Sequence, residues 1–165
     1  MPALTADDFR EHSAWLRTQG AEGKRLQVSH ADLTEADLTG KNLASAQLTH
    51  AKLSGAILIG TDFGGADLSQ ADLSKVDASG ANFKKAILNG ADFHSADLDG
   101  VQFQEASLVG ASFAGADASG AQFDNGNVAQ ANFTNADLSG ADFTGANQAG
   151  LILEGADLTD ARGLN

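Results

Sequence analysis

The segment Gly80–Gly100 reads GANFKKAILNGADFHSADLDG, and its apolar residues recur at a fixed interval of five. Large apolar side chains stand at Phe83, Leu88, Phe93 and Leu98, and alanine precedes each of them by two positions. An α-helix returns to the same face about every 3.6 residues, and a β-strand about every 2. A period of five fits neither element, so this segment indicates a different regular backbone.

The same register continues without insertion from Leu26 to Asp160, which makes 27 consecutive five-residue units. We call the large apolar position of each unit its centre. Leu or Phe fills 22 of the 27 centres, and alanine stands two positions before the centre in 20 units. Gly and polar residues follow the centre, as is typical of turns. So short a repeat buries its apolar face only against its neighbours, which predicts a solenoid.

The distribution of phenylalanine indicates how many units close one coil. Phe occurs at the centres 63, 83, 103, 123 and 143 and at the centres 93, 113 and 133, and the other two sets of centres spaced by twenty contain none. If four corners close a coil, residues twenty apart stack at roughly 4.8 Å. Phe would then occupy two opposite sides of the coil. We therefore predict an all-β fold, a four-sided parallel β-helix with stacked phenylalanines.

These units resemble those of the pentapeptide repeat family, as in Ala31-Asp32-Leu33-Thr34-Glu35 and Ala71-Asp72-Leu73-Ser74-Lys75. The resemblance covers residues 26–162 and implies a right-handed quadrilateral β-helix whose centres and small residues point inward. Gln148 at a centre and Leu151 at a small position depart from the pattern. We therefore expect the coil around residues 146–155 to be less regular than the others.

Residues 1–25 lie outside the register and predict a short capping α-helix. Thr5 and Asp8 fit the N-cap and the third helical position, a weaker form of the capping box. Apolar residues follow at helical spacing up to Leu16, and Gly20 is a suitable stop. We expect a helix over residues 6–19 that covers the N-terminal end of the core.

The other end of the rod has no matching cover in the sequence. The predicted β-helix ends at residue 162, and a tail of residues 163–165 remains. An open β-stack exposes unpaired backbone groups and invites association. Either the last coil is left bare, or a second molecule covers it in a homodimer through the C-terminal coil, with Leu153, Leu158 and Leu164 in or near the contact.

The charge of the chain is strongly acidic and unevenly distributed. The formal net charge is −12, and residues 96–160 contain ten acidic residues and no Lys or Arg. Such a surface repels nucleic acid and anionic membranes and suits a protein partner with a basic surface. The absence of cysteine excludes disulfides and thiolate metal sites. No secretory signal or long apolar run is visible, so we expect a soluble, cytoplasmic protein.

One set of aspartates falls at the position before the centre, at intervals of twenty. It comprises Asp77, Asp97, Asp117, Asp137 and Asp157. In the predicted coil these side chains share one face at about 4.8 Å spacing, which makes them a candidate partner surface. The alternative is that aspartate is simply the usual residue of the family at this position. A flat face offers no pocket to desolvate a pair of carboxylates, so we predict no catalytic site.

The histidines give little indication of chemistry. His30 and His50 hold the same position in adjacent coils, but two ligands alone do not make a metal site, so we predict neither a metal nor a cofactor. His12 and His94 have no evident acid or nucleophile partner in the sequence. The exposed pair Ile57 and Ile59 is a further candidate contact patch.

Two functions fit these observations. The first is a non-catalytic interaction or scaffold protein, since no nucleotide loop, catalytic triad or metal motif is present. The alternative is an acidic DNA mimic that binds a topoisomerase such as DNA gyrase. The acid-only segment and the rod shape favour this alternative. The lack of the C-terminal dimer element that is typical of such family members argues against it.

Overall fold

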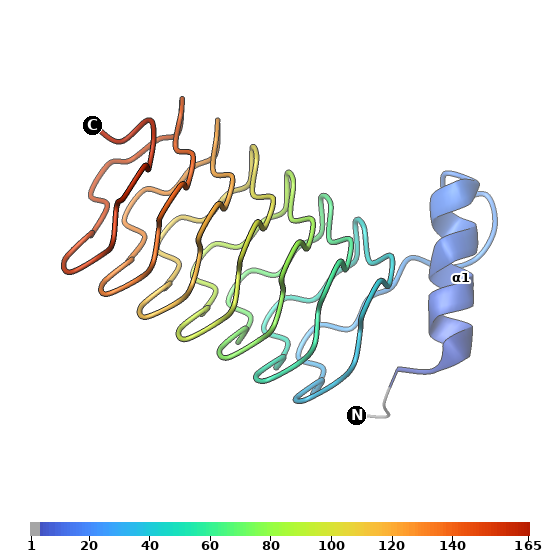
Figure 1. Cartoon of the computed structure of the whole chain (residues 1–165). Helices are drawn as coiled ribbons and strands as arrows, with labels where there is room; N and C mark the ends of the chain where they lie inside the picture. The colour runs from blue at the N-terminus through green and yellow to red at the C-terminus, as the bar shows by residue number, and fades with distance from the viewer. Residues whose placement is uncertain (1–3) are drawn as a thin grey trace.

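The computed structural model describes residues 4–165 and shows a rod with one helix at its N-terminal end (Figure 1). The helix, α1, spans Ala6–Arg17. From Gln27 onward the chain winds into successive coils along the rod, and the last paired residue is Arg162. No helix in residues 4–165 is long and apolar enough to cross a membrane.

Parallel β-bridges define the coil. They join residues twenty apart, beginning with Gln27 and Gln47 and continuing in steps of five to Asp142 and Arg162. Four sides therefore close each coil, in agreement with the sequence prediction. The described residues contain isolated bridges and no longer strand, because a turn follows every fifth residue and leaves one bridged residue on each side.

The corners of the rod share one backbone feature, a residue with positive φ. In the unit centred on Leu33, the carbonyl of Leu33 accepts a hydrogen bond from the N–H of Ala36 at 3.1 Å, and Glu35 between them has a φ of +57°. This is the signature of a type II turn, whose third residue requires positive φ. Positive φ recurs at each fifth residue from His30 to Asp160. The high glycine content of the repeats follows from this requirement.

Replacing Gly100 by alanine is expected to lower the free energy of unfolding by about 1 kcal/mol, as measured by urea denaturation. Gly100 has a φ of +62°, and a Cβ added there would meet nothing within 4 Å, so the cost is conformational rather than steric. Ser95, with a φ of +56°, is the matched control because Ser95→Ala exchanges one L-residue for another. Equal losses in both variants would contradict this account of the corners.

The core is a column of side chains that fills the inside of the coils. Its phenylalanines form two stacks, and within a stack neighbouring ring centroids lie 4.5 to 5.3 Å apart, as for Phe113 with Phe133 and Phe83 with Phe103. Rings of the two stacks meet edge to face, as Phe103 and Phe113 do at 5.9 Å. The predicted segregation of phenylalanine onto two sides is confirmed.

Helix α1 begins and ends through specific side-chain bonds. The Thr5 side chain accepts a hydrogen bond from the N–H of Asp8, and the Asp8 carboxylate accepts one from the N–H of Thr5 at 2.7 Å, which completes a capping box. The helix ends at Arg17, before the predicted residue 19, and the Thr18 hydroxyl donates to the carbonyl of Ala14 at 2.8 Å. The predicted capping helix is therefore present, with a slightly shorter extent.

His12 attaches α1 to the first coil. Its side chain is fully buried, and its Nδ1 accepts a hydrogen bond from the N–H of Leu26 at 3.1 Å. Trp15 stacks against the imidazole ring at 6.0 Å, and the Arg25 guanidinium lies 5.8 Å from the Trp15 ring. The helix therefore covers the N-terminal end of the core, as the sequence predicts.

Acidification is expected to destabilise the protein through His12. Burial lowers the pKa of His12 below its usual 6.5, the backbone of Ala44 opposes this shift, and the charge of Arg25 adds to it. Below that pH the unfolded chain binds a proton that the folded chain excludes. The stability that depends on neutral His12 is therefore fully present above the pKa that His12 has in the unfolded chain. It decreases as the pH falls towards the lower pKa that His12 has in the folded chain.

The measurement is urea unfolding between about pH 7 and pH 5, compared with a His12→Gln variant that keeps an acceptor for Leu26 but does not titrate. We expect the pH dependence over this range to be smaller in the variant. An unchanged slope would show that other groups cause the acid sensitivity. His94→Gln is the control, since His94 is half-exposed.

The C-terminal coil differs from the expectation in two respects. Its register is unbroken, because Leu151 N–H still donates to the Gln148 carbonyl at 3.1 Å and Ile152 still pairs with Asn132. The Gln148 side chain binds the tail: its Nε2 donates to the Gly163 carbonyl at 2.6 Å, and its Oε1 accepts from the N–H of Asn165 at 3.2 Å. The tail thus covers part of a coil for which the sequence indicated no cover from the chain itself.

Candidate protein-interaction surface

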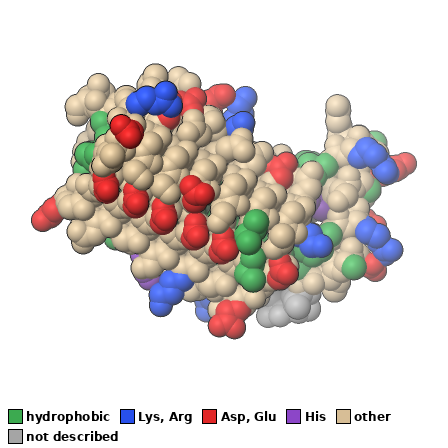
Figure 2. All heavy atoms as spheres, in the orientation of Figure 1, with side chains coloured by type: hydrophobic (Ala, Val, Ile, Leu, Met, Phe, Trp, Pro, Cys, Tyr) green, Lys and Arg blue, Asp and Glu red, His purple; other side chains and the backbone are tan. Residues whose placement is uncertain are grey.

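The predicted aspartates lie side by side on one face of the rod. Successive parallel bridges link Asp77 to Asp97, then to Asp117, Asp137 and Asp157. We call these five residues the aspartate column. Figure 2 shows a row of acidic side chains running along the rod. The sequence therefore placed these residues correctly, and their role as a partner surface stays a prediction.

Each aspartate of the column is bonded to its own turn. The Oδ1 of Asp117 accepts hydrogen bonds from the N–H of Ser119 at 3.0 Å and from its hydroxyl at 2.7 Å. Asp157 is bonded in the same way by Thr159, at 2.9 and 2.7 Å. Such a bond to the backbone two residues ahead stabilises a turn. Aspartate therefore has a structural use here, which explains its frequency throughout the repeats.

This bonding also fixes the charges in place. Within residues 4–165, the Oδ1 atoms of the column take up these local bonds, and no hydrogen bond is made to their Oδ2 atoms. The hydrogen bonds from Thr159 lower the pKa of Asp157, so its carboxylate is ionised at neutral pH. The column therefore presents a row of carboxylates that are held by one oxygen and free at the other.

A line of glycines runs beside the column. These glycines are the turn residues of the same side of the rod, from Gly40 to Gly140 at intervals of twenty. An added Cβ would meet nothing within 4 Å at Gly60, Gly80 and Gly100. The absence of a side chain at these glycines leaves room beside the column for a flat partner. Sequence reasoning missed this feature, although the spacing of twenty was present in the sequence.

An apolar patch continues the column towards α1. Ile57 forms the β-bridge to Asp77 and is 40% exposed, and Ile59 in the following turn is 42% exposed. Figure 2 shows hydrophobic side chains at the end of the acidic row. The surface thus combines a charged row with an adjoining apolar contact, which is common in protein interfaces.

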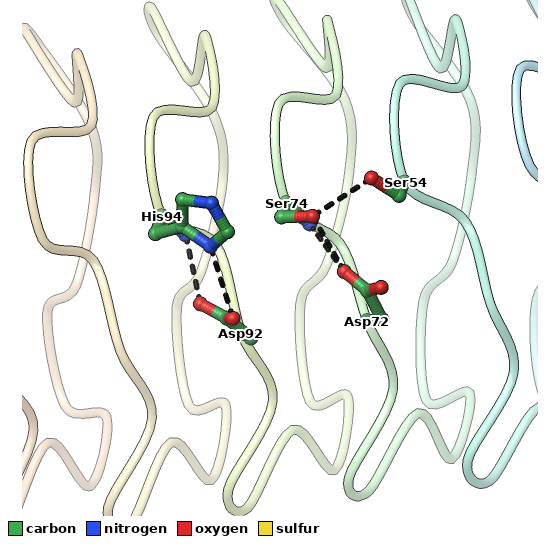
Figure 3. Close-up of polar contacts among 5 residues, drawn as sticks. All are labelled: Ser54, Asp72, Ser74, Asp92 and His94. Carbon is green, nitrogen blue, oxygen red and sulfur yellow. Dashed lines mark hydrogen bonds and ion pairs between the residues drawn. The ribbon is translucent and has the colours of Figure 1, made fainter.

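His94 has an acidic partner, contrary to the sequence analysis. Its Nδ1 lies 3.0 Å from the Oδ2 of Asp92, and its N–H donates to the Oδ1 of Asp92 at 3.0 Å (Figure 3). The partner was overlooked because it stands only two residues earlier, at the position where aspartate bonds its own turn. His94 has the place in its turn that Ser or Thr has in other turns.

Ser74 lies in the coil next to His94, but it is bonded elsewhere. Its hydroxyl donates to the Oδ1 of Asp72 at 2.6 Å and lies 2.9 Å from the hydroxyl of Ser54 (Figure 3). Both Ser74 and His94 are thus held by the aspartates of their own turns. This arrangement stabilises turns and does not align a base with a nucleophile, which nucleophilic catalysis would need.

His30 and His50 lie next to each other in adjacent coils. His30 and His50 stack at 4.8 Å with their rings nearly parallel, so the predicted proximity is confirmed. Among residues 4–165, no group of three or more His, Asp or Glu side chains could hold a metal ion.

Leu158 is 39% exposed at the C-terminal end, whereas Leu153 and Leu164 pack partly against the core. Their part in a dimer stays a prediction.

The coils, the repeated corners and the aspartate column define a solenoid of five-residue units. Family models described as pentapeptide repeats match residues 29–65 and 61–100, and a model described as a pentapeptide repeat region matches residues 86–162. The chain belongs to the pentapeptide repeat family, whose members form right-handed quadrilateral β-helices. Proteins of this family are generally structural or interaction modules.

Solved structures of the family resemble the rod. HetL from Nostoc sp. strain PCC 7120, a protein involved in regulating heterocyst differentiation, is 26% identical with a TM-score of 0.65, over 89% of this chain and 92% of HetL. The protein alr5209 from Nostoc is 30% identical with a TM-score of 0.54, over 68% of this chain and 84% of its own.

The plasmid-mediated fluoroquinolone resistance protein QnrB1 shares the fold at 20% identity and a TM-score of 0.53, over 84% of this chain and 91% of QnrB1. At this level of sequence identity, the similarity to QnrB1 shows a shared fold alone. The comparison with curated proteins gave no match.

Proposed function

We propose that this protein is a non-catalytic scaffold that binds a partner with a basic surface through the aspartate column. The observation that carries the proposal is the run of five bridged aspartates from Asp77 to Asp157 beside a line of turn glycines. The carboxylates are already ordered by their own turns, so a partner does not bear the entropy cost of fixing them.

The spacing of the column suits a helical partner. Adjacent carboxylates repeat at about 4.8 Å, the separation of bridged chains. Lysine or arginine residues three or four apart on a helix stand about 5–6 Å apart. A basic helix laid along the column can therefore bring successive cations near successive aspartates, and Ile57 and Ile59 give it an apolar contact at one end.

A second candidate, mimicry of DNA, is favoured by the density of charge along the rod. Residues 96–160 carry ten acidic residues and no Lys or Arg, and they fill about 16 Å of rod at twenty residues per 4.8 Å. This equals roughly one charge per 1.6 Å, close to the value of about 1.7 Å for duplex DNA. These charges are spread over the sides of the rod, however, whereas the aspartate column concentrates charge on one face.

The test begins with capture of partners from native lysate on the immobilised protein, followed by elution in rising salt. A contact between charges predicts elution at moderate salt, because screening weakens such contacts. A DNA supercoiling assay with gyrase separates the two candidates. Inhibition of gyrase would support mimicry of DNA, whereas a basic partner unrelated to DNA would support the scaffold. If the only partners recovered bind through apolar contacts and are not eluted by salt, both candidate functions are contradicted.

A further inference from the structure

A groove with three cationic side chains in its lining lies at the opposite end of the rod from the acid-only segment. It runs between α1 and residues 40–42 of the first coil and has a volume of about 720 Å³. Its helix side is formed by Phe9, Arg10, Ser13, Ala14 and Arg17. The groove is separate from the aspartate column, so what binds in it does not depend on the function proposed above.

Three cationic side chains line this groove. Arg10, Arg17 and Lys41 are three of the ten basic residues in a chain of net charge −12. Figure 2 shows Lys and Arg side chains around the α1 end of the rod. Among residues 4–165, the lining contains no acidic residue, so the groove itself favours an anionic occupant.

The cations of the groove are available to a ligand. Arg10 pairs with Asp7, and Arg17 lies 3.8 Å from Glu22, but all four side chains are largely exposed. Exposed pairs of this kind contribute little and exchange partners readily. Within residues 4–165, Lys41 has no carboxylate within 4.0 Å, and its Nζ lies 5.3 Å from the centre of the Phe9 ring.

The floor of the groove is small and partly apolar. Ser13, Ala14 and Gly40 carry short side chains or none, and Phe9 gives an aromatic wall that is only partly buried. Arg10 and Arg17 stand seven residues apart on α1, which separates them by about 10 Å along the axis. On an extended chain, side chains that share a face are two or four residues apart, which separates their carboxylates by about 6.6 or 13 Å.

We propose that this groove binds an extended acidic segment of a partner protein, with its carboxylates on Arg10, Arg17 and Lys41 and an apolar side chain against Phe9. The occupant follows from charge complementarity with the three cationic side chains of the lining. The rod would then carry two surfaces of opposite preference, a basic groove for an acidic segment and the aspartate column for a basic one.

The test measures the binding of a fluorescein-labelled peptide of alternating Glu and Leu to the whole protein by fluorescence anisotropy at low salt. Arg10→Gln combined with Lys41→Gln is expected to weaken binding about tenfold. The matched control is Lys75→Gln with Lys84→Gln, which makes the same change in net charge at exposed positions away from the groove. Equal weakening by the two double variants would overturn the proposal.

A second variant tests the groove itself without a change in charge. Ser13→Trp fills the floor from an exposed position on α1 and is expected to reduce binding of the same peptide by about tenfold. Far-ultraviolet circular dichroism checks that α1 is retained. A peptide of alternating Gln and Leu that binds as tightly as the acidic one would contradict the role of charge.

Two further readouts identify the occupant. Displacement of the acidic peptide by a DNA or RNA oligonucleotide at lower concentration than by unlabelled acidic peptide would overturn the peptide assignment. Sedimentation that shows self-association of the protein, lost in the Arg10→Gln and Lys41→Gln variant, would assign the groove to a second copy and also overturn it. The supporting result is a peptide complex that resists the oligonucleotide, in a protein whose oligomeric state the Arg10→Gln and Lys41→Gln variant does not change.

Discussion

Phe103→Ala is expected to lower the free energy of unfolding by about 3–5 kcal/mol, the range typical of a large aromatic side chain removed from a packed core. Phe103 has no exposed surface and lies between Phe83 at 5.3 Å and Phe123 at 5.1 Å in one stack. It also meets Phe93 and Phe113 edge to face, at 5.7 and 5.9 Å. The cavity would interrupt both stacks in the middle of the rod.

Urea denaturation followed by circular dichroism measures this loss. The control is Gln102→Ala, one residue earlier, where the side chain is only partly buried and makes no hydrogen bond within residues 4–165. We expect the control to change the free energy of unfolding by less than about 0.5 kcal/mol. Equal losses at the two positions would contradict the register of the repeat.

The core and the coil could be predicted because they depend on periodic burial. Phenylalanines spaced by twenty, from Phe63 to Phe143, can stack only if four units close a coil, and the structure confirms this. The length of the paired segments depends instead on backbone angles. A turn with positive φ at every fifth residue leaves one bridged residue on each side of the coil, which the five-residue period alone does not predict.

The ends of the rod were predicted less completely. The capping box at Thr5 has a local sequence pattern, so the helix start could be predicted. The role of Gln148 could not, because its amide bonds to Gly163 and Asn165 depend on how the tail folds back. A polar residue at a centre therefore looked like a defect in the repeat, although it holds the tail in place.

The candidate surface was predicted by position but not by chemistry. The interval of twenty places Asp77 to Asp157 on one face. The bond from each Oδ1 to its own turn is a local geometry that pattern reasoning did not consider, and it also accounts for the missed pair of Asp92 and His94. The same carboxylate stabilises its turn through one oxygen and exposes the other to a partner. The frequency of aspartate alone therefore cannot separate a structural role from a binding role.

Replacing the whole aspartate column by asparagine is expected to weaken binding of a basic partner by about a hundredfold at low salt. Five exposed charge contacts at about 0.5 kcal/mol each give roughly 2.5 kcal/mol, and each 1.4 kcal/mol is about a factor of ten. Asparagine keeps the side-chain oxygen that accepts from the turn, as Asn132 does from Thr134 N–H at 3.0 Å. The variant should therefore fold with nearly unchanged stability.

The matched control removes the same number of charges from other sides of the rod. It changes to asparagine a set of aspartates that also accept a hydrogen bond from the backbone two residues ahead: Asp32, Asp62, Asp67, Asp72 and Asp92. Titration calorimetry with the captured partner at low and high salt compares the two variants. If the column mediates binding, only its variant loses the affinity and most of the salt dependence. Equal weakening would show that total charge, and not the column, attracts the partner, and unchanged binding in both would leave aspartate with its structural role alone.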